Sequence, residues 1–469
     1  MRFISSRSLP WLLAGLALAV AGSWPLASSS TEPPGATALG VQAARLDPDY
    51  WIRRLDQPDR IVLDAAAIRR LNASLVAEEP SLHDLESLPA LLPAGQVRSW
   101  IEALSVEPTR QLHGVDGHAL PRQAFERLRE NLALDAIPER QPVRYGLVVR
   151  RADLRTFPTR LRVFREPGDT DIDRFQESAL FPGTPVAITH ESRDGDWFFV
   201  VAPNYAAWIE QRHVALGSKR DVFDYTRRKP FRVVTDPTVR TVHAPEAPRV
   251  SGLQLDMGVR VPALDRWPAD QPVNGQHPGF GHAVQLPVRS ESGLLEFSPA
   301  LLPRRAGLAD DYLSLTRANL LRQAFNFLGE RYGWGHAYDA RDCSGFVAEV
   351  YRSFGLQLPR NTGDQSRSKA LDRIDVSALD SRGERRAVVD GTAAGDLVYI
   401  PGHVMMVVGH VGGEPWVIHD IHGMNLRAAD GGTRRVVLNA VVVTPLLPML
   451  ADDGTPILDH VTTIVRIGR

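Results

Sequence analysis

Cysteine is nearly absent from this chain of 469 residues, which contains only Cys343. A disulfide within the chain needs two cysteines and is therefore excluded. A cysteine metal site usually needs more than one and is therefore disfavoured. Two uses remain for Cys343, as a buried apolar filler or as a nucleophile. On this residue alone the two interpretations are equally good.

A net charge is lacking as well. The formal charge of −1 gives no electrostatic basis for binding nucleic acid or an anionic membrane surface. A hydrophobic share of 43% and a charged share of 23% are ordinary for globular proteins. A chain of this length does not fold around one core, so we predict two to four domains.

The apolar run at the N-terminus, residues 9–21, is shorter than the ~20 apolar residues that a membrane span needs. Arg2 and Arg7 precede it and small residues follow it, which is the layout of a secretory signal. We therefore predict a signal peptide over residues 1–30 and an exported protein, periplasmic or secreted, without a membrane span once the signal is removed. The alternative is a membrane anchor. A lone thiol kept in an oxidising compartment suggests that it has a use.

The spacing of apolar residues divides the rest of the chain. After a linker at 31–40, residues 41–140 carry apolar residues every three to four positions, broken by Pro89, Pro93 and Pro108. This pattern predicts an N-terminal helical domain of short helices that wrap another unit. In residues 143–217 the period becomes two, which predicts a small β-barrel or sandwich. Residues 218–302 look like a second, less regular β domain.

Residues 305–469 begin with helices and end with strands. Thr316 is an N-cap candidate for one helix, and a second helix is predicted to start at Cys343 and stop at Gly355. Strands are expected at 396–400, 403–408, 415–419 and 461–467. Helices followed by antiparallel strands predict an α+β domain.

Cys343 falls at the start of that second helix, where free N–H groups and the helix dipole favour the reactive thiolate. His403 opens an apolar strand and His419 ends the next one. If the two strands pair antiparallel, His419 can hydrogen-bond the far nitrogen of His403 and fix its tautomer. The same histidines have a plain interpretation as polar strand ends. A zinc site of His403, His419 and His422 is a weaker alternative, because this set lacks the usual further ligands.

The motifs around Cys343 resemble those of the NlpC family, the papain-like cysteine peptidases of bacterial cell walls. The resemblance covers about 305–469 and rests on five stretches: Tyr332-x-Trp-Gly, Asp342-Cys-Ser-Gly-Phe346, Leu358-Pro-Arg-Asn-Thr362 with Gln365, Gly395-Asp-Leu397 and Gly402-His-Val404. Residues 145–155 and the element Tyr205-x-x-Trp208 resemble the first of two SH3-like domains that precede this domain in γ-D-glutamyl-diamino-acid endopeptidases. His336 stands where the family usually has glycine.

The resemblance implies roles for individual residues. Cys343 corresponds to the nucleophile, His403 to the general base and His419 to the orienting third residue. Substrate-binding roles are implied for Asp342 and Ser344, which flank the nucleophile, for Tyr332, which borders the site, and for Tyr205 of the first SH3-like domain, which we expect to help recognise the free amine of an L-alanine.

The predicted function is that of a cysteine peptidase that cuts the γ-D-glutamyl–diamino acid bond of peptidoglycan stem peptides, with fragments that carry a free N-terminal L-Ala preferred. The fold expected is a papain-like catalytic domain behind two SH3-like barrels and a helical segment. Peptidoglycan-derived peptides are the expected partners of a monomer, with no cofactor, metal or nucleic acid. The alternatives are a degenerate wall-binding protein and an amidase or acyltransferase on the same fold.

Overall fold

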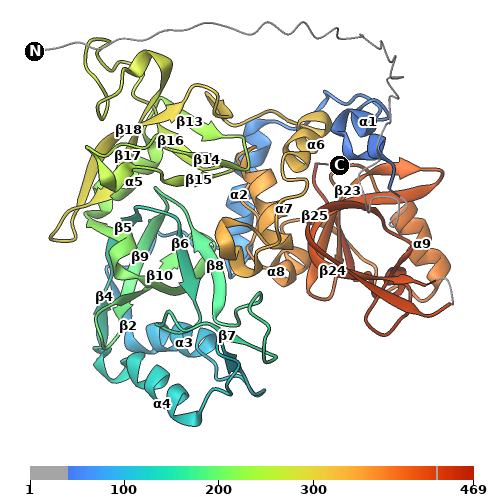
Figure 1. Ribbon diagram of the computed structural model, residues 1–469, viewed down its shortest axis with the longest axis horizontal. Helices are drawn as coiled ribbons and strands as arrows, with labels where there is room; N and C mark the ends of the chain where they lie inside the picture. Colours follow the sequence, from blue (N-terminus) through green and yellow to red (C-terminus); the bar gives the residue numbers. More distant parts are fainter. Residues whose placement is uncertain (1–40, 429–430, 469) are drawn as a thin grey trace, which may run out of the picture.

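The computed structural model describes residues 41–428 and 431–468. The predicted signal peptide, residues 1–30, and the linker at 31–40 lie outside the described residues. A bilayer-crossing helix, which must be long and apolar, does not occur within the described part of the chain. Figure 1 shows two β units on one side, a red antiparallel sheet on the other and the helices α2, α6, α7 and α8 between them.

The N-terminal helical segment supplies two different cores. Trp51, Ile68 and Leu75 pack into the core of the C-terminal domain, whereas Val97 and Ile101 pack into the core of the first β unit. The helices are therefore short elements that wrap other units, as their prolines predicted. They are α1 (Pro48–Ile52), α2 (Ala65–Glu78), α3 (Ala94–Leu104) and α4 (Arg122–Asn131), with the short strands β1 (Ile61–Leu63), β2 (Leu91–Pro93), β3 (His113–Gly114) and β4 (Arg140–Pro142).

The first β unit is a seven-stranded antiparallel sheet in the order β12-β5-β9-β10-β11-β6-β8. Residues of β10 are buried on both faces, so the sheet lies between two apolar layers. One layer includes helices α3 and α4 of the N-terminal segment. The strands are β5 (Arg144–Val148), β6 (Ala152–Arg155), β8 (Gln176–Leu180), β9 (Pro185–Glu191), β10 (Trp197–Ala202), β11 (Tyr205–Glu210) and β12 (Val214–Gly217), and β7 (Val163–Phe164) pairs with β3.

The second β unit is less regular, as its sequence pattern predicted. It consists of a three-stranded sheet β16-β13-β19 and two hairpin-like pairs, β14-β15 and β17-β18, around one apolar core. Helix α5 (Lys219–Arg227) connects it to the first unit. The strands are β13 (Phe231–Val234), β14 (Thr238–Arg240), β15 (Gln254–Asp256), β16 (Arg260–Pro262), β17 (Gly281–Arg289), β18 (Leu295–Pro303) and β19 (Leu308–Ala309).

The C-terminal domain has the predicted α+β plan. Its sheet runs β21-β27-β22-β23-β24-β25, with antiparallel pairs throughout and β26 added against β24. The helices are α6 (Arg317–Phe325), α7 (Cys343–Arg352), α8 (Thr362–Arg367) and α9 (Arg382–Asp390). The strands are β21 (Asp372–Asp375), β22 (Leu397–Ile400), β23 (His403–Val411), β24 (Glu414–Arg427), β25 (Thr433–Pro445), β26 (Met449–Leu450) and β27 (Thr463–Arg466), and β20 (Leu315–Thr316) pairs with β1.

The C-terminal sheet differs from the sequence prediction in the length of β24 and in the presence of β25. Strand β24 continues well past His419, and it pairs along its length with β25, which the pattern did not reveal. The pairing of Arg427 with Thr433 belongs to the outer part of this hairpin, where polar residues alternate irregularly and hide the strand period. The helix ends were predicted well: the Thr316 side chain caps α6, and Gly355, with φ of +84°, follows α7.

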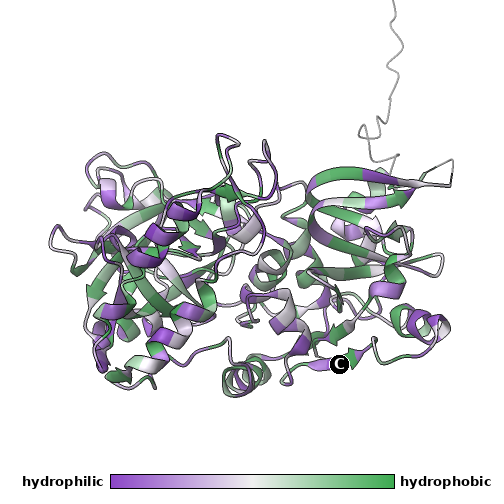
Figure 2. Ribbon diagram, turned by 90° about the horizontal axis from the view of Figure 1, so that it is seen from below, coloured by the Kyte–Doolittle hydropathy of each residue, from purple (hydrophilic) through white to green (hydrophobic). Residues whose placement is uncertain are grey.

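Helix α7 packs against the sheet because its apolar side chains share one face. Phe346, Val347 and Val350 are fully buried in the same core as Val404 and Met406 of β23. Figure 2 shows hydrophobic residues concentrated along the central strands and hydrophilic residues on outer helices and loops. This packing places the first residue of α7 above the end of β23 at which His403 lies.

Candidate active site

Cys343 is the first residue of α7, and its side chain is nearly buried. The Asp342 carboxylate caps the helix by accepting a hydrogen bond of 2.8 Å from the Gly345 N–H. The thiol lies 4.0 Å from the carbonyl oxygen of Gly402. Gly402 belongs to the two-residue turn between β22 and β23, where its φ of +78° favours glycine. The residue after it is His403, so this turn brings the predicted base to the predicted nucleophile.

Cys343 and His403 line one cavity of ≈ 500 Å³. Tyr332 lines it as well, together with His422 of β24. The volume is in the range of small-molecule sites, and a nucleophile and a base in one cavity is the arrangement that covalent catalysis requires.

The two predicted histidines form a relay. Nε2 of His403 and Nδ1 of His419 are 2.8 Å apart, and Nε2 of His419 lies 3.0 Å from the hydroxyl oxygen of Thr444. The Thr444 hydroxyl in turn donates to the sulfur of Met449, at 3.9 Å. Thr444 therefore acts as acceptor for His419, and His419 as acceptor for His403. The neutral His403 imidazole therefore carries its proton on Nε2, and its Nδ1 is unprotonated and can accept a proton.

Burial keeps the resting pair uncharged. Burial, followed by the charge of Asp342, raises the pKa of the Cys343 thiol to about 12, while burial lowers the pKa of His403 to about 4. Burial likewise lowers the pKa of His419. The prediction that the helix start would favour a thiolate is therefore wrong for the substrate-free protein, because the loss of water outweighs it. A thiol in this state can act as a nucleophile only if its proton leaves during the attack itself.

Asp342 and Ser344 flank Cys343 but lie outside the residues that line this cavity. Both carboxylate oxygens of Asp342 accept from the guanidinium of Arg360, at 3.0 and 2.7 Å, and Arg360 also donates to the Ser344 hydroxyl at 2.9 Å. Burial alone would raise the pKa of Asp342, but Arg360, His336 and the hydrogen bonds outweigh it and hold the pKa at about 2. Arg360 was part of a sequence motif, yet no role had been predicted for it.

His336 occupies a buried position next to this ion pair. Its Nδ1 accepts from Arg360 at 2.9 Å, so its Nε2–H donates to Glu349 at 3.1 Å. Its backbone φ of +64° explains why glycine is usual here. The imidazole thus fills the space between α7 and Arg360 and joins two buried charged groups.

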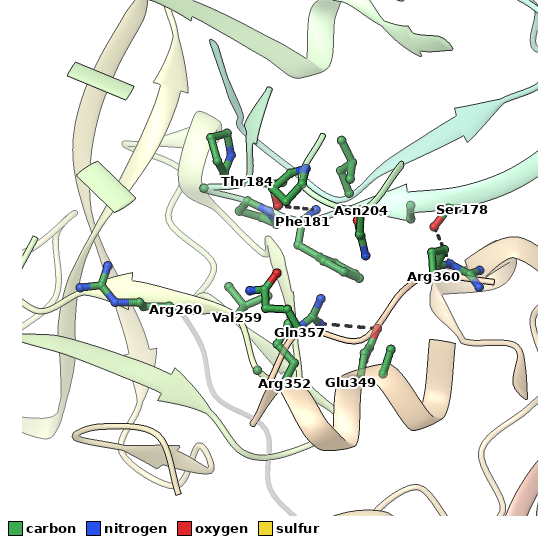
Figure 3. A pocket seen from close by; sticks show the side chains of 18 of the residues that line it. Ser178, Phe181, Thr184, Asn204, Val259, Arg260, Glu349, Arg352, Gln357 and Arg360 are labelled. Carbon is green, nitrogen blue, oxygen red and sulfur yellow. Dashed lines mark hydrogen bonds and ion pairs between the residues drawn. The ribbon is translucent and has the colours of Figure 1, made fainter. Parts of the chain in front are cut away.

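Figure 3 shows a second cavity, of ≈ 280 Å³, on another side of α7. Here Arg360 donates to Ser178 of the first β unit at 2.7 Å, and Arg352 pairs with Glu349 at 3.7 Å. Phe181 lies in the middle of this junction. The Arg360–Ser178 contact joins the first β unit to the C-terminal domain, whereas the Arg352–Glu349 pair lies within α7; Cys343 is not among the residues that line this cavity.

Tyr205 of β11 lies at the same junction rather than in the catalytic cavity. Its hydroxyl donates to the Glu177 carboxylate at 2.5 Å. Burial, and then the charge of Glu177, raises the pKa of Tyr205, whereas Arg360 and Asn361 act in the opposite direction. Tyr205 and Glu177 therefore face the segment that carries Arg360. Nothing in the sequence singled out Glu177, because it belongs to no motif and a glutamate is usually a surface residue.

The zinc alternative lacks support from the geometry. His403 and His419 bond to each other, and His422 pairs with Asp171 of the first β unit at 3.5 Å. Within residues 41–428 and 431–468 no cluster of three or more histidine, cysteine, aspartate or glutamate side chains has the arrangement of a metal site.

Two segments of the chain match the models of known protein families. Residues 329–439 match the model of the NlpC/P60 family, and residues 162–210 match that of an SH3 domain of the SH3b1 type. The chain contains an NlpC/P60 domain. The matched segment includes Cys343, His403 and His419, and Thr444 lies just beyond its end.

Individual relatives are distant. A gamma-D-glutamyl-L-lysine dipeptidyl-peptidase of Bacillus cereus is 26% identical over 215 residues, which are 42% of this chain and 56% of that protein. The chain thus matches little more than half the length of that curated relative. The structure of an NlpC/P60 endopeptidase from Photobacterium damselae subsp. piscicida has a TM-score of 0.68 at 16% identity and covers 89% of this chain and 96% of its own. An NlpC/P60 family protein from Bacillus cereus gives a TM-score of 0.46 at 19% identity over 69% of this chain and 100% of its own.

Proposed function

We propose that this protein is a cysteine endopeptidase that hydrolyses the γ-D-glutamyl–diamino acid bond of peptidoglycan stem peptides. The observation that carries the proposal is the relay that links His403, His419 and Thr444 in the cavity that contains Cys343. The NlpC/P60 domain supports the class of reaction, and the distant relative named for γ-D-glutamyl-L-lysine supports the bond.

In the proposed reaction the Cys343 sulfur attacks the γ-amide carbonyl as its proton passes to Nδ1 of His403. The developing imidazolium is stabilised by the bond from its Nε2–H to His419. The amide N–H groups of Cys343 and Ser344 open α7, where a helix supplies no carbonyl partners, so they are the proposed donors to the oxyanion, with Tyr332 in the lining of the same cavity. His403 then gives its proton to the departing amine, and water activated by His403 hydrolyses the thioester.

The first β unit is proposed to select the free end of the peptide. Glu177 and Tyr205 lie next to Arg360 and Asn361, and a carboxylate in that place suits an alkyl ammonium group. Arg360 in turn pairs with Asp342, the residue before Cys343, and so connects the Glu177–Tyr205 pair to the nucleophile. The separation between the Glu177 carboxylate and the Cys343 thiol would then select peptides with a free N-terminal L-Ala of the right length. Cross-linked wall would not fit between them. The secretory-signal layout of residues 1–30 supports a proposed location outside the cytoplasm.

The test uses the full mature chain and two substrates. The protein is incubated with L-Ala-γ-D-Glu-diaminopimelate and with intact sacculi, and the products are analysed by mass spectrometry. We expect L-Ala-γ-D-Glu and free diamino acid from the peptide and little release from sacculi. Cys343→Ala should abolish cleavage, and a Cys343→Ala protein that still cuts would refute the mechanism.

Two alternatives give other results in the same experiment. A degenerate wall-binding protein would sediment with sacculi and leave the peptide intact. An amidase or acyltransferase would give products with different new termini. Glu177→Gln should raise KM for the peptide with a free amine but not for its N-acetylated form, which isolates the proposed role of the first β unit.

A further inference from the structure

The catalytic cavity extends well beyond Cys343 and His403. Its far part is formed by β24, β26 and the segment 451–460. The proposed reaction has His403 protonate the departing amine, so the residue after the scissile bond must lie on the His403 side. Given the proposed function, on which this inference rests, the far part of the cavity receives the diamino acid.

The wall of this part is apolar. Met405, Met424, Met449 and Ile457 line it and are almost fully buried. Thioether side chains adapt to flexible aliphatic groups, and a chain of methylenes gains free energy when it leaves water. The wall therefore suits the aliphatic part of a long side chain.

The rim of the same part is acidic. Asp452 and Asp453 line it, with side chains that are 95% and 59% exposed. Hydrogen bonds from Thr455 lower the pKa of Asp453, so its carboxylate is charged at neutral pH. Asp452 accepts a hydrogen bond of 3.0 Å from Asn425, which holds it at the rim.

Among the described residues, the lining of the cavity supplies no permanently charged cation to offset these carboxylates. The described residues that line it include histidines but neither lysine nor arginine. His460 of the lining lies 3.7 Å from Asp453, and Arg435 pairs with Asp452 at 3.6 Å from outside the lining, so each exposed carboxylate has one partial basic partner and remains open to the cavity. An apolar wall that ends in carboxylates is complementary to a side chain with several methylenes and a terminal ammonium.

We propose that the cavity wall around Met424 and Met449 is the subsite for the side chain of the diamino acid, and that Asp452 and Asp453 select its terminal ammonium. The lysine side chain satisfies both parts. Diaminopimelate carries a carboxylate beside the same ammonium, and that carboxylate meets the acidic rim, where the nearby basic groups His460 and Arg435 already contact the two aspartates. The two carboxylates therefore contribute more to the binding of lysine than to that of diaminopimelate.

The test compares three tripeptides, L-Ala-γ-D-Glu followed by L-lysine, by L-norleucine or by meso-diaminopimelate. Norleucine keeps the aliphatic chain and lacks the ammonium. We expect the wild-type protein to prefer lysine to norleucine by about fivefold in kcat/KM, the size of a partly exposed ion pair. In the variant Asp452→Asn/Asp453→Asn this preference should vanish through a rise in KM, with kcat unchanged and the diaminopimelate peptide little affected.

Asp390→Asn is the matched control, because Asp390 is a charged residue of the same domain that pairs with Arg386 away from the cavity. It should leave all three rates unchanged. Both single variants, Asp452→Asn and Asp453→Asn, are measured with a thermal melt to verify folding. Equal rates for lysine and norleucine in the wild type, or a preference that survives in the double variant, would overturn the inference. Failure to cut any of the three peptides would instead refute the proposed function.

Discussion

Removal of the imidazole at position 419 should lower turnover without disturbing substrate binding. His419 is fully buried, and its Nδ1 lies 2.8 Å from Nε2 of His403. In His419→Ala the Nε2–H of His403 loses the acceptor that the fully buried His419 provides. An unsatisfied buried donor costs about 1–3 kcal/mol, which corresponds to a fall of about 5- to 150-fold in kcat/KM.

Two companion variants separate orientation from packing. His419→Asn keeps a carbonyl that can accept from His403 and should recover much of the lost rate. Thr444→Val preserves volume but removes the acceptor for Nε2 of His419, so that imidazole can place its proton on Nδ1 instead. His403 would then hold its own proton on Nδ1 and lose its function as base, and kcat should fall while KM stays constant.

The assay is steady-state cleavage of the defined tripeptide, with the melting temperature of each variant as the check on folding. If folded His419→Ala retains the wild-type kcat/KM, the relay has no catalytic role. If His419→Asn and His419→Ala lose equal activity, the hydrogen bond is not the source of the effect, and packing of the imidazole is.

Three further predictions concern charge. Because burial raises the pKa of Cys343 to about 12, iodoacetamide should modify this only cysteine slowly at neutral pH, with a rate that climbs with pH; rapid alkylation below pH 7, seen by intact mass, would contradict this. Arg360→Lys loses the paired hydrogen bonds to Asp342 and should destabilise the protein by roughly 3–5 kcal/mol in urea unfolding, whereas the exposed-site control Arg367→Lys should change it by less than about 1 kcal/mol. Asp420 is buried with both oxygens unpaired among the described residues, so its folded-state pKa is raised and its ionisation costs stability as pH rises above 3.8, by up to about 1.4 kcal/mol per pH unit. Asp420→Asn should therefore gain stability relative to the wild type between pH 4 and pH 8, and a difference that does not change with pH would show that the carboxyl titrates normally.

The alternation of apolar residues determined the class of fold from the sequence. A period of three to four marks helices wherever one face is buried, and a period of two marks strands, so the helices at α6 and α7 and the strands β9, β10, β22 and β23 followed from local pattern. The hairpin β24–β25 did not, because the outer half of β25 is largely exposed and burial in the outer half of β24 does not alternate with a period of two.

The position of Cys343 at a helix start and the positions of His403 and His419 at strand ends were also readable from the sequence. Their protonation states were not. Helix-start geometry favours a thiolate, and only the packing of α7 on the sheet shows that burial reverses the balance. Thr444, the last member of the relay, had no local signal, because a threonine in an apolar strand is also an ordinary strand residue.

What the sequence by itself determined is therefore the set of candidate site residues and the elements that carry them, since the elements depend on contacts between near neighbours in the chain. The tertiary structure decided which distant side chains meet them: Arg360 on Asp342, Glu177 beside Tyr205, and the acidic rim opposite His403. Such contacts depend on how separate units pack, and single residues on different elements leave no periodic trace of that packing in the sequence.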